Sequence, residues 1–324
     1  MKTKKTMLLI LSLIMIFSVA PILKAASAVK DDAILRQTFN LGGQRSQQIQ
    51  YFTMESKLIS YALNGKRVGT DIYRLRLKCV PAKLAGTKGD QWTCTRFTVQ
   101  FGDKPEIEVP AIKNWTYVFK IPPTGIDEKG QTLGIDHSRF ANLVDASGNA
   151  VPPDKGYHVY NAFIDFHGFC DVFGERIEGG KGIQELKNIG QKIVHAAANT
   201  EAPVNLGSSI AKGSTFKNGE VTMELKGLSR VDGAACAMVG FDSGESSFKM
   251  IVKPMPNMEV NTVGSSHYKG DIYIDLSTNW ARKVTMYELV VSETTLPMPP
   301  NKINSVIERD ILVRNVGVKE FARR

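Results

Sequence analysis

GDIYIDLSTNWARKVTMYELVVSE, residues 270–293, decides the fold class of this 324-residue chain. Two runs rich in β-branched and aromatic residues flank the polar segment STN, and apolar and polar side chains alternate within each run. A period of two is typical of a strand with one buried and one solvent-facing side. Two such runs joined by a polar turn predict a pair of long antiparallel strands.

The same alternation recurs on both sides of this stretch. Tyr73, Leu75 and Leu77 alternate with basic residues, and the runs TRFTVQF (95–101) and WTYVFKI (115–121) follow the same pattern. Further strand-like runs come after residue 216: VTMEL, CAMVGF, SSFKMIV and VIERDILVRNV. Strands of this number and length, joined by short polar turns, predict a strongly curved antiparallel sheet.

The central part of the chain differs in character. From residue 157 to 173 the sequence is apolar almost all round, which predicts a largely buried helix. A second helix is predicted where Ile183, Leu186, Ile189 and Ile193 recur at spacings of three and four residues. Turn-rich sequence brackets both segments. The pattern therefore predicts a helical insertion between two strand-rich parts.

We accordingly predict an α+β fold, mostly a curved antiparallel β-sheet, with a β-rich half at 29–124, a helical and loop segment at 125–215 and a second β half at 216–324. The two halves share an order of features. IYRLRLKCV…GDQWTCTRFTVQFGD in the first resembles VTMELKGLSRVDGAACAMVGFDSG in the second. The shared order is compatible with an internal duplication, and any two hairpins could equally produce it.

The first 28 residues, MKTKKTMLLILSLIMIFSVAPILKAASA, have the features of a secretory signal peptide. Three early lysines precede an uncharged run from Met7 to Leu23, and the small residues before Val29 predict cleavage after Ala28. The alternative is an uncleaved membrane anchor, for which the run is short. The sequence thus predicts an exported protein, periplasmic or extracellular after cleavage.

The charge balance excludes one class of partner. The whole chain has 41 basic and 32 acidic residues, and the signal segment carries four of the lysines, which leaves a net charge of +5 on residues 29–324. Lys and Arg are dispersed along the chain apart from the terminal Arg323-Arg324. Nucleic-acid binding requires clustered cations, so the sequence does not support it.

Four cysteines suit an exported protein, in which disulfides are permitted. Cys79 and Cys94 lie in neighbouring strand-like runs joined by a short loop, so we predict a disulfide between them. Cys170 and Cys236 stand in apolar surroundings, and the sequence leaves open whether they pair. It shows no CxxC or HxxxH spacing and therefore indicates neither a metal site nor a cofactor.

Three segments resemble a family of exported bacterial proteins of unknown function: YNAFIDFHGFCDVF, NIGQKIVHAAANTEAPVNLGSSIAKGS and the region from GFDSGESSFKM to VVSE (240–293). The architecture also resembles curved-sheet proteins of the outer-membrane lipoprotein carrier type. Gly270, Tyr273 and Asp275 match the terminal hairpin of such proteins, whereas Asn279-Trp280 stands where a tight glycine turn is common. The resemblance implies a curved sheet and a lipid-like ligand, and it supplies no catalytic residues.

One polar stripe on the first predicted helix is the candidate site. At 100° per residue, His158, Asn161 and Asp165 lie on one side of an otherwise apolar helix. An imidazole and a carboxylate could line a polar cleft and support proton transfer. Alternatively, the stripe is simply the solvent-facing side of the helix. His167 points to the opposite side, and we expect it to be buried with a hydrogen-bond partner.

The functional interpretation follows from what these patterns contain and lack. The sequence favours a non-catalytic exported binding or interaction protein, with an apolar concave sheet face that holds its own helix or a lipid-like small molecule. An envelope protein is the other kind of partner expected. The alternative is an exported hydrolase that uses His158 and Asp165.

Overall fold

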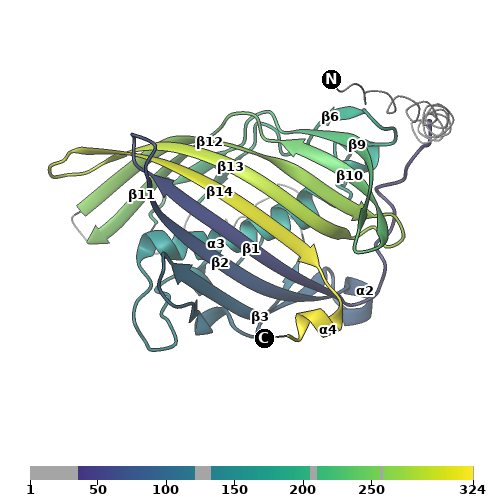
Figure 1. Ribbon diagram of the computed structural model, residues 1–324, viewed down its shortest axis with the longest axis horizontal. Helices are drawn as coiled ribbons and strands as arrows, with labels where there is room; N and C mark the ends of the chain where they lie inside the picture. The colour runs from purple at the N-terminus through teal and green to yellow at the C-terminus, as the bar shows by residue number, and fades with distance from the viewer. Residues whose placement is uncertain (1–35, 121–132, 205–209, 256–257, 324) are drawn as a thin grey trace, which may run out of the picture.

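The computed structural model describes residues 36–120, 133–204, 210–255 and 258–323 (Figure 1). The predicted signal segment and its cleavage site therefore lie outside the described residues. Antiparallel strands dominate the described chain, as the sequence predicts. No helix within the described ranges is long and apolar enough to cross a membrane.

The strands fall into two groups along the chain. The first group is β1 (Gln50–Tyr61), β2 (Arg67–Val80), β3 (Asp90–Phe101), β4 (Ile107–Glu108) and β5 (Trp115–Phe119). Three short strands follow: β6 (Lys192–Val194), β7 (Glu201–Pro203) and β8 (Thr215–Lys217). The second group is β9 (Thr222–Val231), β10 (Ala234–Asp242), β11 (Ser246–Met255), β12 (Met258–Asp275), β13 (Ala281–Thr295) and β14 (Lys302–Asn315).

The helical elements are few. The main one is α3 (Pro153–His167), which continues as a π-helical segment (Gly168–Phe173). The short helices α2 (Ala82–Ala85) and α4 (Val318–Phe321) lie near one end of the sheet (Figure 1). Single 3₁₀ turns occur at Pro110–Ile112, His137–Phe140 and Ile183–Glu185.

All the strands belong to one sheet. Its order is β4-β3-β2-β1-β14-β13-β12-β10-β9-β6, while β5 pairs with β3, and β11, β8 and β7 branch from β12. The terminal strand β14 pairs with β1 from Phe52↔Asn315 to Tyr61↔Val306, and this pairing joins the two β groups. The structure thus shows one continuous, unclosed sheet; the similarity of its two halves stays a prediction.

Alternation along the strands divides the sheet into two faces. On β2, Tyr73, Leu75 and Leu77 are buried, whereas the intervening basic residues are partly exposed. Helix α3 lies behind the strands in Figure 1, against the face that carries the buried residues. We call this the inner face and the opposite one the outer face.

Helix α3 fills the inner face with aromatic side chains. Phe163 and Phe166 are fully buried. Phe166 meets Phe52 at 5.3 Å and Trp92 at 5.1 Å between ring centroids, and Phe163 stacks on Phe97 at 5.7 Å. Fully burying an aromatic or large aliphatic side chain contributes about 1.5–3 kcal/mol. The predicted buried helix is therefore confirmed, and the inner face holds the chain's own helix.

The second predicted helix is wrong. Residues 183–185 form one 3₁₀ turn, and Lys192–Val194 form strand β6 instead. Gly190 has φ +84°, which interrupts an α-helix. The Gln191 side chain accepts hydrogen bonds from the N–H groups of Lys187 and Asn188 and donates to the Glu185 carbonyl, which stabilises a loop. The isoleucines recur at helical spacing here because they are the buried or partly buried side chains of a loop.

The predicted disulfide is not formed, although the hairpin that carries it is confirmed. Strands β2 and β3 are neighbours, but Cys79 lies opposite Trp92 and Cys94 lies opposite Leu77. Residues two apart in register are roughly 7–8 Å apart, beyond the usual range of a disulfide. All four cysteines are buried free thiols.

Candidate functional site

The predicted polar stripe lies between α3 and the inner face of the sheet. Asp165 forms an ion pair with Arg309 of β14, and the two side chains are only 15% and 10% exposed. Arg309 also donates to Glu288 of β13 at 2.6 Å. Asn161 hydrogen-bonds to Tyr157, one turn earlier on the helix. The stripe therefore faces the sheet and is not simply a solvent-facing side of the helix.

Burial controls the protonation of this cluster. It raises the pKa of Asp165 to about 6, against the opposing effect of the Arg309 guanidinium. Glu288 additionally contacts the hydroxyl of Ser266. One guanidinium is thus shared by two buried carboxylates, an arrangement that is stable only while the arginine is present. These contacts anchor α3 to β13 and β14.

His158 is separated from this cluster. It lies seven residues before Asp165, about 10 Å along the helix axis. Its ring packs 5.7 Å from that of Tyr73, and its Nδ1 atom is buried without a hydrogen-bond partner among the described residues. Burial lowers the pKa of His158 to about 3, so the imidazole is neutral near pH 7. The structure therefore does not assemble His158 and Asp165 into a dyad.

The sequence did not reveal a second buried series of hydrogen-bonded polar groups. The His167 ring accepts or donates at both nitrogens, with Tyr117 Oη at 2.7 Å and Asp171 Oδ2 at 2.6 Å. Asp171 in turn receives a hydrogen bond of 2.7 Å from Arg45, whose guanidinium lies 4.2 Å from the Trp280 ring centre. The prediction that His167 is buried with a partner is confirmed.

This series of hydrogen bonds holds separate segments of the core together. Burial alone would raise the pKa of Asp171, but the hydrogen bond from His167 and the charge of Arg45 lower it overall. The groups come from the amino-terminal segment, β5 and the end of α3, and His167 is fully buried. Only the spacing of His167 and Asp171, four residues apart, was visible in the sequence.

His195 belongs to neither of these clusters. It is buried beside Phe173, at 4.8 Å between ring centroids, and its Nδ1 accepts the N–H of Ala197 at 3.1 Å. Burial lowers its pKa to about 4. Within the described ranges, no group of three or more His, Cys, Asp or Glu side chains could hold a metal ion.

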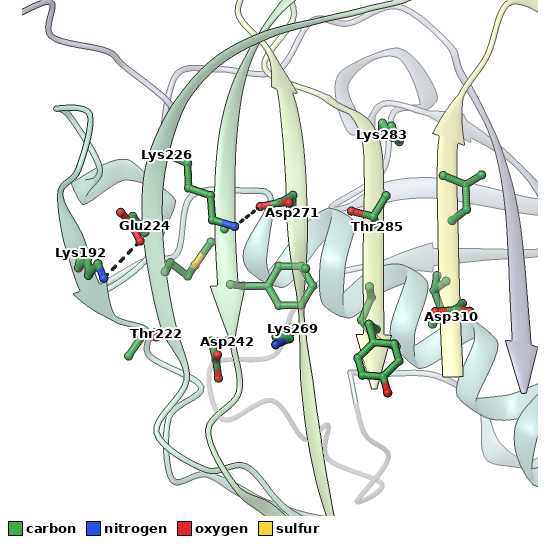
Figure 2. A pocket seen from close by; sticks show the side chains of 18 residues that line it. Lys192, Thr222, Glu224, Lys226, Asp242, Lys269, Asp271, Lys283, Thr285 and Asp310 are labelled. Atoms are coloured by element: carbon green, nitrogen blue, oxygen red, sulfur yellow. Dashed lines mark hydrogen bonds and ion pairs between the residues drawn. The ribbon is translucent and has the colours of Figure 1, made fainter. Parts of the chain in front are cut away.

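A depression lies on the outer face, away from the predicted stripe. Figure 2 shows side chains from β6, β9, β10, β12, β13 and β14 that surround a hollow of about 910 Å³. Its midline follows one register row, in which Glu224 lies opposite Gly240, Gly240 opposite Asp271, and Asp271 opposite Thr285. The hollow therefore runs across the strands.

Gly240 in this row lets a lysine side chain lie across the strand. A Cβ atom at Gly240 would lie 2.2 Å from Cε of Lys226, because the lysine side chain folds over the glycine. Lys226 then reaches Asp271 at 2.6 Å, and Lys192 pairs with Glu224 at 3.4 Å, as the dashed lines in Figure 2 show. The next row along the strands, with Lys269 opposite Tyr287, forms one wall.

A second, smaller depression continues the first. It has a volume of about 330 Å³ and is lined from β14, β1, β2, β3 and the loop that holds Glu106, and it shares Leu312 with the larger one. The same register row passes through Leu312, Glu55, Arg74 and Thr98. Together the two depressions form what we call the outer groove, from β9 to β3, roughly 30 Å long at the usual strand spacing.

The sequence could not reveal the outer groove. Its lining residues alternate with core residues on nine different strands, and they become neighbours only through the register of the sheet. The signal available was the polar half of each alternating run, which any solvent-facing strand also carries.

Comparison with known proteins adds little. No protein-family model matches the chain, and no curated protein matches it. Among solved structures, OmpF of Salmonella typhi in complex with daunomycin is similar at a TM-score of 0.15 and 6% identity, covering 86% of this chain and 100% of that one. The outer membrane channel DcaP of Acinetobacter baumannii gives 0.14 and 8%, covering 85% of this chain and all of that one. Likenesses this weak carry no argument about fold or function.

Proposed function

We propose that the protein is an exported, non-catalytic binding protein whose ligand lies in the outer groove. The observation that carries this proposal is the continuity of the groove across the strands from β9 to β3, with charged and hydroxyl side chains along its whole length. A surface of this length suits an extended ligand or partner. It does not require any group to transfer a proton or attack a bond.

The contacts on the inner face also favour a non-catalytic protein. Asp165 and Glu288 share Arg309, while His167 and Asp171 are engaged with each other and with Tyr117 and Arg45. These groups hold α3 against the sheet. Because α3 fills the inner face with aromatic side chains, we place the ligand on the outer face and keep a lipid-like molecule or an envelope protein as partners to be tested there.

Export is a separate part of the proposal and rests on the amino-terminal sequence. The mature protein should begin at Val29, after cleavage that follows Ala28. Amino-terminal sequencing of protein purified from its native compartment tests this. Recovery of Met1 in a membrane fraction would replace the exported form with an anchored one.

The groove is tested by filling it. Thr285 lies at the middle of the groove on β13 and points outward, so Thr285→Trp should occupy the space without disturbing the core. Thr116→Trp on β5 is the matched control, because Thr116 is exposed and lies outside the groove. Both variants and the wild type are screened against immobilised polysaccharides, peptides and phospholipid vesicles.

We expect one ligand class to bind the wild type and the Thr116→Trp control, with at least a tenfold loss of affinity in Thr285→Trp. Circular dichroism and thermal unfolding of the variants establish that the fold is intact. A ligand that binds Thr285→Trp as well as the wild type would overturn the proposed site, as would the absence of binding in all three classes.

A further inference from the structure

The smaller depression of the outer groove is rich in arginine. Its lining contains Arg74, Arg76, Arg96 and Arg314, against two acidic residues, Glu55 and Glu106, so its charge is +2. The arginines come from β2, β3 and β14, which the sheet register brings together. Arginine binds carboxylate and phosphate groups through paired N–H donors, which makes this cluster suited to anions.

The acidic neighbours of these arginines lie near the surface. The shortest pairs are Arg74 with Glu55 and Arg314 with Glu320, both at 2.8 Å, and these side chains are 34–47% exposed. Arg96 lies 3.8 Å from Glu106, and Arg314 lies 3.4 Å from Asp232, with all four side chains more than a third exposed. Exposed ion pairs of this kind contribute about 0–1 kcal/mol to stability. A ligand that brings several negative charges could therefore replace these partners at little cost.

The cations also form a line. Lys283 lies opposite Arg314 on neighbouring strands, Arg314 opposite Thr53, Thr53 opposite Arg76, and Arg76 opposite Arg96. The row runs at right angles to the strands along one wall of the outer groove and contains no acidic residue. Its positions repeat at the strand spacing of about 4.8 Å.

We infer that the outer groove binds an acidic polysaccharide, whose sugar carboxylates lie on this row of cations. The inference rests on the proposed function. A linear polyuronate carries one carboxylate on each ring, and because successive rings turn about the chain, carboxylates on one side recur about two rings apart. This is comparable to the two strand spacings between Arg314 and Arg76. An extended acidic peptide presents side chains on one face at about 6.6 Å instead. A peptide that crosses the strands also cannot pair its backbone with the sheet, whereas sugar hydroxyls can bond to Thr53 and Thr285.

Binding of polygalacturonate to the full mature chain tests this inference. We expect saturable binding that weakens as salt increases, since the contacts are charge pairs. The double variant Arg96→Ser, Arg314→Ser should lower the affinity at least tenfold. The control Lys249→Ser, Lys302→Ser also removes two exposed cations, but from β11 and the start of β14, outside the groove, and it should bind like the wild type.

Three comparison polymers and one kind of vesicle separate the outcomes: neutral dextran, polyglutamate, polyphosphate and phosphatidylglycerol vesicles. Preference for polyglutamate, polyphosphate or vesicles over polygalacturonate would overturn the polysaccharide inference. Equal loss of affinity in both double variants would show general charge attraction and would overturn it too. If Thr285→Trp blocks another ligand while polygalacturonate fails to bind, the proposed function stands and this inference falls.

Discussion

Arg309 of β14 and Asp165 of α3 form an ion pair across the interface between the sheet and its only long described helix. The same guanidinium binds Glu288 on the neighbouring strand. A single side chain therefore fixes the helix to two strands. The pair is buried, so its partners depend on each other far more than partners at a surface do.

Removal of this arginine should be strongly destabilising. Arg309→Met leaves two buried carboxylates side by side without a cation, and we expect a loss of about 3–5 kcal/mol in the free energy of unfolding. Urea denaturation at pH 7 measures it. Arg314→Met is the matched control on the same strand, where the ion pairs are exposed and the loss should stay within about 1 kcal/mol. Equal losses in both variants would contradict the anchoring role of Arg309.

Asp165 should impose a pH dependence of definite sign. Its pKa is raised to about 6 in the folded protein, whereas an unfolded aspartate titrates near 3.9. The folded state therefore binds more protons in this window, and the contribution of Asp165 to stability is lost as the pH rises from about 4 to 6.

Asp165→Asn removes this dependence. Relative to the wild type, the variant should gain roughly 2–3 kcal/mol in unfolding free energy between pH 4 and pH 7. Denaturation series at several pH values give the difference curve. The exposed Asp310→Asn on β14 serves as the control and should follow the wild type. A flat difference curve for Asp165→Asn would show that the carboxyl titrates normally.

The series of hydrogen bonds through His167 predicts losses of stability that differ from one variant to the next. His167→Phe leaves Asp171 with Arg45 but without its imidazole partner, and the cost of an unsatisfied buried group is about 1–3 kcal/mol. Tyr117→Phe removes only the outer hydrogen bond and should cost about 1 kcal/mol. Thermal unfolding of the two variants ranks them. A larger loss in Tyr117→Phe would contradict the order of this series.

The cysteines should be unreactive thiols in the folded protein. All four are buried, and burial raises the pKa of the Cys94 thiol well above its usual range, which leaves little thiolate. Titration with a thiol reagent should detect none of them in the native state and all four after denaturation. Detection of only two thiols after denaturation would indicate one disulfide, and peptide mapping would then identify the bonded pair.

Local patterns predicted the strands and the first helix because burial alone determines them. The alternation around Tyr73 and the apolar run from 157 to 173 each describe one element packed against a core. At residues 183–194 the same kind of spacing failed, since Gly190 and the side chain of Gln191 stabilise a loop. Local turn chemistry outweighed the periodicity there.

The polar stripe was found from the sequence, but its environment was not. Helix geometry placed Asp165 on the correct side, yet its partner Arg309 is 144 residues away in the chain. The outer groove depends in the same way on strand register, which a single sequence does not determine. What remained hidden in both cases was the long-range pairing of residues.

His158 is the residue at which a packing role and a catalytic role are most easily distinguished. Its imidazole is neutral because burial lowers its pKa to about 3, and an unfolded histidine titrates near 6.5. The folded state thus binds fewer protons between these values, and stability is lost as the pH falls from 6.5 toward 3. The Nδ1 atom also has no hydrogen-bond partner in the described chain, which makes the polar ring costly to bury.

His158→Phe should therefore retain or increase the stability of the protein at pH 7. At pH 5 its advantage over the wild type should be larger by about 2 kcal/mol, which corresponds to 1.5 pH units below the unfolded pKa. Chemical denaturation at the two pH values measures this difference. His267→Phe is the comparison variant, because His267 is half exposed on β12 and, unlike His158, has a polar partner, Asp242 at 2.7 Å. Loss of stability at both pH values in His158→Phe would instead show that the imidazole makes contacts needed by the fold.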